Sequence, residues 1–229
     1  MKYRILTVIA AVGLLFTMLA VPVKADQGIA IGVVGNMASF NTTGSETEGN
    51  EITEATVGND VDYTSMFIEY TAREGMGGIA VGVEHVPGTA SIGAKSRTDS
   101  NDENSGSNDG TYTAKAEVED LWTAYVEPTF YPIEALGIYL KGGVSQVTVN
   151  SLESIALGTD SSTYGNETIR GVVGGAGIRL VSPWGIFLKL EYLKTDYQTL
   201  TLKSDTGNKN AIKADVGQES TRLALGYQF

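Results

Sequence analysis

Residues 186–192 read Ile-Phe-Leu-Lys-Leu-Glu-Tyr, with a large apolar side chain at every second position. Successive side chains of an extended strand point to opposite faces. Four apolar groups of this stretch therefore share one face, and Phe187, Lys189 and Glu191 share the other. A strand that separates aliphatic groups from charges in this way indicates a sheet whose two sides meet different surroundings.

The same alternation recurs along the chain after the N-terminal segment, and no stretch of useful length shows helical periodicity. Short turns such as 182–185 join some of these stretches into hairpins. The alternation predicts eight strands, at about 28–40, 61–71, 79–84, 116–130, 138–145, 168–181, 186–192 and 216–229.

The predicted connections alternate in length. Four are long and polar, whereas the three between them have only a few residues each. Long loops at one end and tight turns at the other, joining an even number of strands, are typical of outer-membrane barrels. A soluble sandwich need not sort its connections in this way. The pattern predicts an all-β fold, an eight-stranded antiparallel up-and-down transmembrane β-barrel. The long connections are 41–60, 90–115, 150–167 and 201–215.

The N-terminus has the features of a secretory signal peptide at 1–25. Lys2 and Arg4 precede an apolar run, and Val23-Lys24-Ala25 provides a small-residue cleavage pattern. A retained anchor helix is the alternative, because the apolar run is close to the lower limit for spanning a bilayer. We expect an exported protein with a barrel domain at 26–229, integral to the outer membrane of a Gram-negative cell.

Composition excludes several classes of function. The chain has no Cys, one His and a net charge of −11. Thiolate zinc sites, disulfides and multi-histidine metal centres are therefore excluded. The acidic balance disfavours nucleic-acid binding, because phosphate backbones are repelled. We expect no cofactor and no metal.

The face opposite the large apolar groups carries small residues, hydroxyl groups and charges. An eight-stranded barrel is filled by its own side chains, so interior charges must pair to offset their desolvation. The four acids and four bases balance. The set is either a static structural network or a gate that exchanges partners and passes ions. The predicted lumen charges are Glu69, Glu84, Glu127, Lys141, Arg179, Lys189, Glu191 and Arg222.

Aromatic residues lie near the predicted strand ends. Rings with one polar and one apolar edge prefer membrane interfaces, so two girdles are expected. One girdle, on the side of the short turns, comprises Tyr70, Phe130, Tyr131, Trp184, Tyr227 and Phe229, and the other comprises Phe40, Trp122 and Tyr197.

The last seven residues, Leu-Ala-Leu-Gly-Tyr-Gln-Phe at 223–229, form an alternating strand with a terminal Phe. This end resembles the assembly signal of bacterial outer-membrane barrels, although Ala224 stands where a Gly is usual. With the signal peptide and the eight strands, the mature chain resembles the small barrel families typified by the OmpA membrane domain, OmpX and the Opa adhesins. The resemblance implies contact with the barrel-assembly machinery, outer-membrane lipid and lipopolysaccharide. Its signal residues are Leu223, Leu225, Tyr227 and Phe229.

Three hypotheses of function follow. The first is a non-enzymatic barrel with a structural or surface-interaction role, whose long acidic loops contact a cell-surface or phage ligand. The second is a narrow porin-like channel for ions or small solutes through the charged lumen. The third is a soluble secreted β-barrel that binds an apolar ligand, with the two faces inverted. Catalysis is disfavoured, because His85 is the only candidate base and lies on the same face as Val81 and Val83.

Overall fold

The computed structural model describes residues 27–48, 51–99, 110–154, 164–204 and 211–229. The predicted signal peptide lies outside these ranges. None of the described residues forms a helix with the length and apolarity needed to cross a membrane. The strands are β1 (Gln27–Glu48), β2 (Glu51–Glu74), β3 (Gly77–Asp99), β4 (Gly110–Ile133), β5 (Leu136–Ser154), β6 (Glu167–Val181), β7 (Ile186–Tyr197), β8 (Leu200–Lys203) and β9 (Ala211–Gln228).

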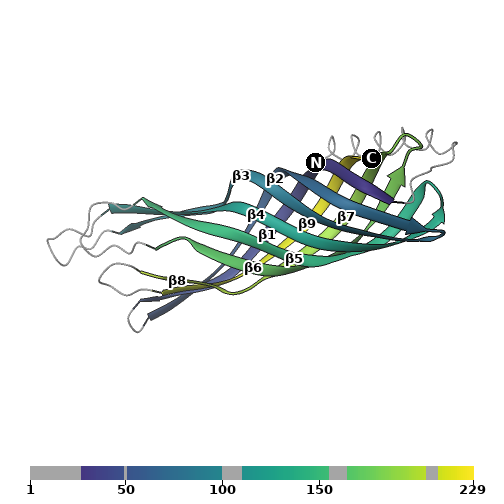
Figure 1. The fold of residues 1–229 in the computed structure, drawn as a ribbon. Coiled ribbons are helices and arrows are strands. Elements are labelled where there is room, and N and C mark those ends of the chain that lie inside the picture. The colour runs from purple at the N-terminus through teal and green to yellow at the C-terminus, as the bar shows by residue number, and fades with distance from the viewer. Residues whose placement is uncertain (1–26, 49–50, 100–109, 155–163, 205–210) are drawn as a thin grey trace, which may run out of the picture.

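The strands close into a ring, which confirms the predicted fold (Figure 1). Neighbours in sequence pair antiparallel, and β9 pairs with β1 to complete the circle. β8 adds no position to the ring, because it continues β7 along the same edge of β9 after a break at 198–199. Paired residues followed once round the ring from Asp60 lead back to β2 at Tyr70. This stagger of ten residues tilts the strands against the barrel axis.

The prediction that the long connections are loops is wrong for most of the residues that the structure describes. β1 and β2 stay paired up to Glu48 and Glu51, so every described residue of 41–60 belongs to their ladder. β3 and β4 likewise remain paired to Asp99 and Gly110. Antiparallel pairing needs no membrane, because the ladder satisfies the backbone and hydroxyl-rich side chains keep the outer face hydrated. Figure 1 shows these strands projecting well beyond one end of the ring. We call this projecting part the extension.

An apolar belt surrounds the barrel below the extension. Large apolar side chains that point outward from the ring are 37–68% exposed. A closed ring is the sheet form that leaves no backbone group unpaired in lipid. The soluble alternative needs these side chains inside and is therefore wrong. The belt comprises Ile29, Ile31, Val33, Met37, Met66, Ile68, Tyr70, Ile79, Val81, Val83, Trp122, Val126, Phe130, Ile138, Leu140, Val144, Val172, Ile178, Ile186, Tyr192, Leu225 and Tyr227.

The outward face changes from apolar to polar where the extension begins. Arg170 Nε donates to Gln146 Oε1 at 3.3 Å, and Lys194 Nζ lies 3.5 Å from Glu219 Oε1. Tyr192 at the edge of the belt donates to Glu219 Oε2 at 2.9 Å. These polar contacts outside the barrel indicate the level of the membrane interface.

The inward face changes in the opposite sense at the same level. Beyond the belt, the interior is an apolar core rather than the predicted set of small and polar groups. The strands project into water here, so the sheet has to bury apolar groups as any soluble sheet does. This extension core comprises Ala38, Phe40, Val86, Val118, Leu121, Val147, Val149, Ile169, Tyr197, Leu200, Leu202, Ala214 and Val216.

Three of the predicted girdle aromatics lie inside the barrel instead. Phe40 and Tyr197 belong to the extension core, and Tyr131 is buried at the opposite end. Strand parity decides this placement, because Tyr131 shares its face with the inward Glu127. Arg73 covers the Tyr131 ring at 4.0 Å from its centroid. Proximity to a strand end therefore does not place an aromatic ring at the interface.

Candidate functional site

The eight predicted lumen charges gather inside the belt. Seven strands of the ring supply them, and β7 supplies two, Lys189 and Glu191. Each of the eight is at most 4% exposed. The structure brings all of them into one set of ion pairs, which we call the charge network.

In the half of the charge network that contains Arg179, basic and acidic side chains alternate along the chain of contacts. Arg179 Nη1 lies 2.6 Å from Glu69 Oε1. Lys189 Nζ bridges two carboxylates, at 2.6 Å from Glu69 Oε2 and 2.7 Å from Glu127 Oε2. Two acids from β2 and β4 are thereby held by bases from β6 and β7 on the far side of the ring.

The alternation continues through Lys141 towards the extension. Lys141 Nζ lies 3.0 Å from Glu127 Oε1 and 3.1 Å from Glu191 Oε1. Arg222 contacts Glu191 through Nε at 3.4 Å and pairs through Nη2 with Glu84. Lys141 is also 4.0 Å from Glu84. Every charge therefore has an opposite charge beside it, as burial requires.

Neutral side chains that the sequence analysis did not single out complete the site. Tyr125 donates to Glu69 and Tyr139 donates to Glu191, both at 2.9 Å, and Ser65 donates to Glu84 at 2.6 Å. These donors alternate with the charges along the same strand faces. The alternation along each strand could have identified these residues as inward-facing. It does not show which carboxylate each hydroxyl group contacts.

Inward glycines make room for the aromatic rings of the site. A Cβ at Gly82 would lie 2.6 Å from Tyr125 Cζ, and a Cβ at Gly177 would lie 2.6 Å from Tyr139 Cζ. A distance of this size forbids a side chain unless the ring moves. The glycines thus fix where the two hydroxyl groups meet their carboxylates.

A small polar cavity lies between the charge network and the extension core. Its volume is about 20 Å³, which is room for about one water molecule. Gln218 lies in its wall, where its Nε2 donates to Tyr63 Oη at 2.6 Å and its Oε1 accepts from Tyr197 at 3.3 Å. Arg222 and Glu84 line the same space.

The site contains a neutral set of paired charges in a nearly filled interior. Among the described residues, no cluster of three or more His, Asp or Glu side chains is placed to hold a metal ion. Six of the eight ion pairs join strands that do not neighbour each other in the sheet, the exceptions being Lys141–Glu127 and Arg222–Glu191, so the network cross-links the ring from within. The arrangement can resist ion entry, because a passing ion has to displace a charge from its partners.

The predicted assembly signal lies on the outside of the barrel. Leu225, Tyr227 and Phe229 are exposed and Leu223 is half-buried. The Tyr227 and Phe229 rings meet edge to face with centroids 5.0 Å apart. Their role in assembly stays a prediction.

His85 lies outside the charge network, on the outward face. Its ring stacks on Trp122 with centroids 4.0 Å apart. A ring stacked at the interface serves as a packing group there, and no lumen charge is beside it.

The closed ring, the apolar belt and the charged interior define a small transmembrane β-barrel of the outer-membrane type. The chain is similar in structure to OprG, an outer membrane protein of Pseudomonas aeruginosa, at 13% identity and a TM-score of 0.42 over 91% of this chain and 99% of that one. It is also similar to Ail, the attachment invasion locus protein of Yersinia pestis, at 13% identity and a TM-score of 0.41 over 88% and 99%. Neisserial surface protein A matches at 12% identity and a TM-score of 0.35 over 85% and 97%. No protein-family model matches the chain, and no curated protein does.

Proposed function

We propose that this protein is a non-enzymatic outer-membrane barrel that holds a stiff, acidic β-structured surface outside the cell for contact with other surfaces. The observation that carries the proposal is the extension. Its strands stay paired far beyond the apolar belt, and its inside is packed like that of a soluble protein. A mobile loop would need neither feature.

The surface of the extension is suited to a hydrated, negatively charged display. Glu54, Asp60 and Asp120 are exposed on its outer face. Acidic and hydroxyl side chains keep such a surface soluble and steer cationic partners towards it. Fixed strands lower the entropy cost of binding relative to loops that order on contact.

The filled interior supports a structural role over a channel. An ion entering from outside would meet the extension core, the cavity of about 20 Å³ and the charge network in turn. We therefore expect no stepwise conductance in planar bilayers. Steps that change in size with Lys141→Gln would support the channel in place of this proposal.

Cysteine labelling tests on which side of the membrane the extension lies. The chain has no cysteine, so an introduced one is the only target. We expect Thr56→Cys, in the β1–β2 hairpin, to react with a membrane-impermeant maleimide on intact cells. Glu134→Cys, in the opposite short turn, is the matched control and should react only after the outer membrane is permeabilised. The reverse result would place the extension in the periplasm and refute the proposal.

Shortening one hairpin tests its contact function. Thr43 pairs with Thr56 and Gly44 with Ala55, so Asn-Gly in place of 45–54 joins the two strands in register. We expect an unchanged heat-dependent shift on SDS gels but reduced adsorption of expressing cells to cationic polymer-coated surfaces and to host cells. A hairpin of native length with its acids changed to amides separates the effect of charge from that of length. Unchanged adsorption in both variants would refute a contact role for this hairpin.

A further inference from the structure

The barrel wall is unpaired between β2 and β3 throughout the extension. The β2–β3 ladder runs from the short turn to Met66 and His85, and the described residues beyond this pair show no further pairing between the two strands. Both strands nevertheless continue, β2 paired with β1 and β3 paired with β4. The extension is therefore open between β2 and β3, where two free strand edges, 59–65 and 86–91, face each other. We call the space between them the β2–β3 gap.

The sequence around the end of the ladder explains the gap. Pro87 follows His85 by two residues and has no N–H to donate to β2. Gly88 has a φ of +91°, and the register between β3 and β4 shifts at this point. Across the shift, Asp120 has a φ of +51°, a conformation that costs energy for a residue with a Cβ. The irregular backbone on the β3–β4 side of the opening, with its one strained residue at Asp120, thus accompanies the end of the β2–β3 ladder.

The edges of the β2–β3 gap can bind hydrogen-bonding groups. Asn59 Nδ2 reaches across and donates to the Ser91 carbonyl at 3.5 Å. The Asn59 amide thus makes a hydrogen bond with β3 that a paired strand would otherwise make. Free strand edges are templates for the addition of another strand.

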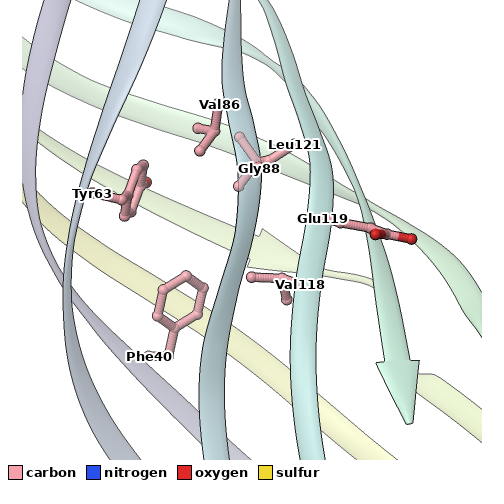
Figure 2. Close-up of a pocket in the computed structure, with 7 residues that line it drawn as sticks. All are labelled: Phe40, Tyr63, Val86, Gly88, Val118, Glu119 and Leu121. Atoms are coloured by element: carbon pink, nitrogen blue, oxygen red, sulfur yellow. The ribbon is translucent and has the colours of Figure 1, made fainter. Parts of the chain in front are cut away.

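An apolar pocket opens beneath the β2–β3 gap. Figure 2 shows Phe40 and Tyr63 on one side of it and Val86, Val118 and Leu121 on the other. Its volume is about 20 Å³, which fits the methyl end of one aliphatic side chain.

The rim of the gap is acidic. Asp60 lies on the β2 side, and Glu119 and Asp120 lie on the β4 side, where Glu119 points away from the pocket (Figure 2). Among the side chains that the structure describes, no basic group forms an ion pair with any of these three. An occupant with positive charge next to an apolar group would match this rim.

We propose that the β2–β3 gap binds an extended basic peptide segment of another protein, by strand addition with one aliphatic side chain in the pocket. This inference rests on the proposed contact function and names the class of partner. A lipid chain or an apolar small molecule could fill the pocket, but it would leave the backbone groups of both edges without partners. Only a peptide supplies alternating donors and acceptors together with side chains at strand spacing.

The test uses the mature protein refolded in detergent and the pentapeptide Thr-Lys-Val-Lys-Thr labelled with fluorescein. Its valine points into the pocket while its lysines point outward to the rim. We expect saturable binding by fluorescence anisotropy. Methylation of the peptide's backbone nitrogens should weaken binding by about tenfold or more, because the strand donors are lost. Exchange of both lysines for glutamates should weaken it similarly.

Protein variants test the place of binding. Pro87→Thr with Gly88→Val restores an N–H and extended backbone, so that β3 can pair with β2, and binding should be lost. Pro132→Thr, near the end of β4 beside the short turn at the other end of the barrel, is the matched control and should bind like the wild type. Asp120→Asn should weaken binding by about two- to fivefold. Heat-dependent mobility on SDS gels verifies that each variant is folded.

Several outcomes would overturn the inference: affinity weaker than about 1 mM, equal binding of the methylated peptide, or equal binding by the Pro87→Thr/Gly88→Val variant. Equal binding of the methylated peptide would identify an apolar ligand instead. These outcomes are distinct from failure of the proposed function. If the shortened β1–β2 hairpin reduces cell adsorption while the gap variants bind normally, the contact function stands and the assignment of the gap falls.

Discussion

Lys141 and Glu191 meet inside the barrel with Nζ and Oε1 3.1 Å apart, although they are 50 residues apart in sequence and their strands are not neighbours in the sheet. The pair crosses the interior, and Lys141 also contacts Glu127 at 3.0 Å. One cation thus holds acids from β4 and β7 against β5. Replacing this lysine should therefore lower the stability of the whole barrel.

We predict that Lys141→Met destabilises the barrel by about 3–5 kcal/mol, because it leaves two buried carboxylates without their shared base. Urea unfolding in lipid vesicles, followed by tryptophan fluorescence, measures the loss. Adding Glu191→Gln should recover part of it, since one unpaired charge is then removed. A single variant as stable as the wild type would show that the network is not a structural brace.

Gly177→Ala should destabilise the barrel by about 1–3 kcal/mol, through displacement of the Tyr139 ring. The added methyl group would lie 2.6 Å from Tyr139 Cζ, and Tyr139 donates to Glu191. Gly174→Ala on the same strand is the control, because nothing lies within 4 Å of its added Cβ. The control should change stability by less than about 0.5 kcal/mol. Equal effects of both substitutions would rule out the ring contact as the cause.

Val147→Asp should loosen the extension while the belt stays closed. Val147 is 3% exposed in the extension core, so the new carboxylate would be buried without a partner. Gln146→Asp introduces the same group on the outward face and should have little effect. Amide hydrogen exchange should become faster in 147–154 and 211–216 for the first variant only. Faster exchange in the belt strands as well would mean that belt and extension unfold as one unit.

Phe229→Ala should lower the amount of barrel in the outer membrane of cells but leave refolding in detergent unchanged. The Phe229 ring is 69% exposed and packs only on Tyr227 among aromatic side chains of the described residues, so little fold stability depends on it. Quantitative blotting of membrane fractions checks the first expectation, and the heat-dependent gel shift checks the second. Equal losses in both assays would make the residue a stability element rather than an assembly signal.

Sequence by itself determined which way the side chains of the belt strands face. The alternation in residues such as Phe187, Lys189 and Glu191 is a local property with a period of two, so it separated lumen from lipid before any partner was known. It also predicted the hairpins and the ring, because short turns permit only antiparallel neighbours.

Only the tertiary structure decided which partners the inward-facing side chains contact. Lys141 reaches Glu191 because the ring closes with a stagger of ten residues, which no single hairpin encodes. The extension core and the β2–β3 gap arise in the same way. Composition alone predicts loops in the Thr-rich and acidic stretches, because such residues suit hydration. The strands continue there instead, and Phe40 and Val147 are buried in one core. Strand pairing joins residues that are far apart in sequence. The first and last paired residues of each ladder are therefore visible only in the closed barrel.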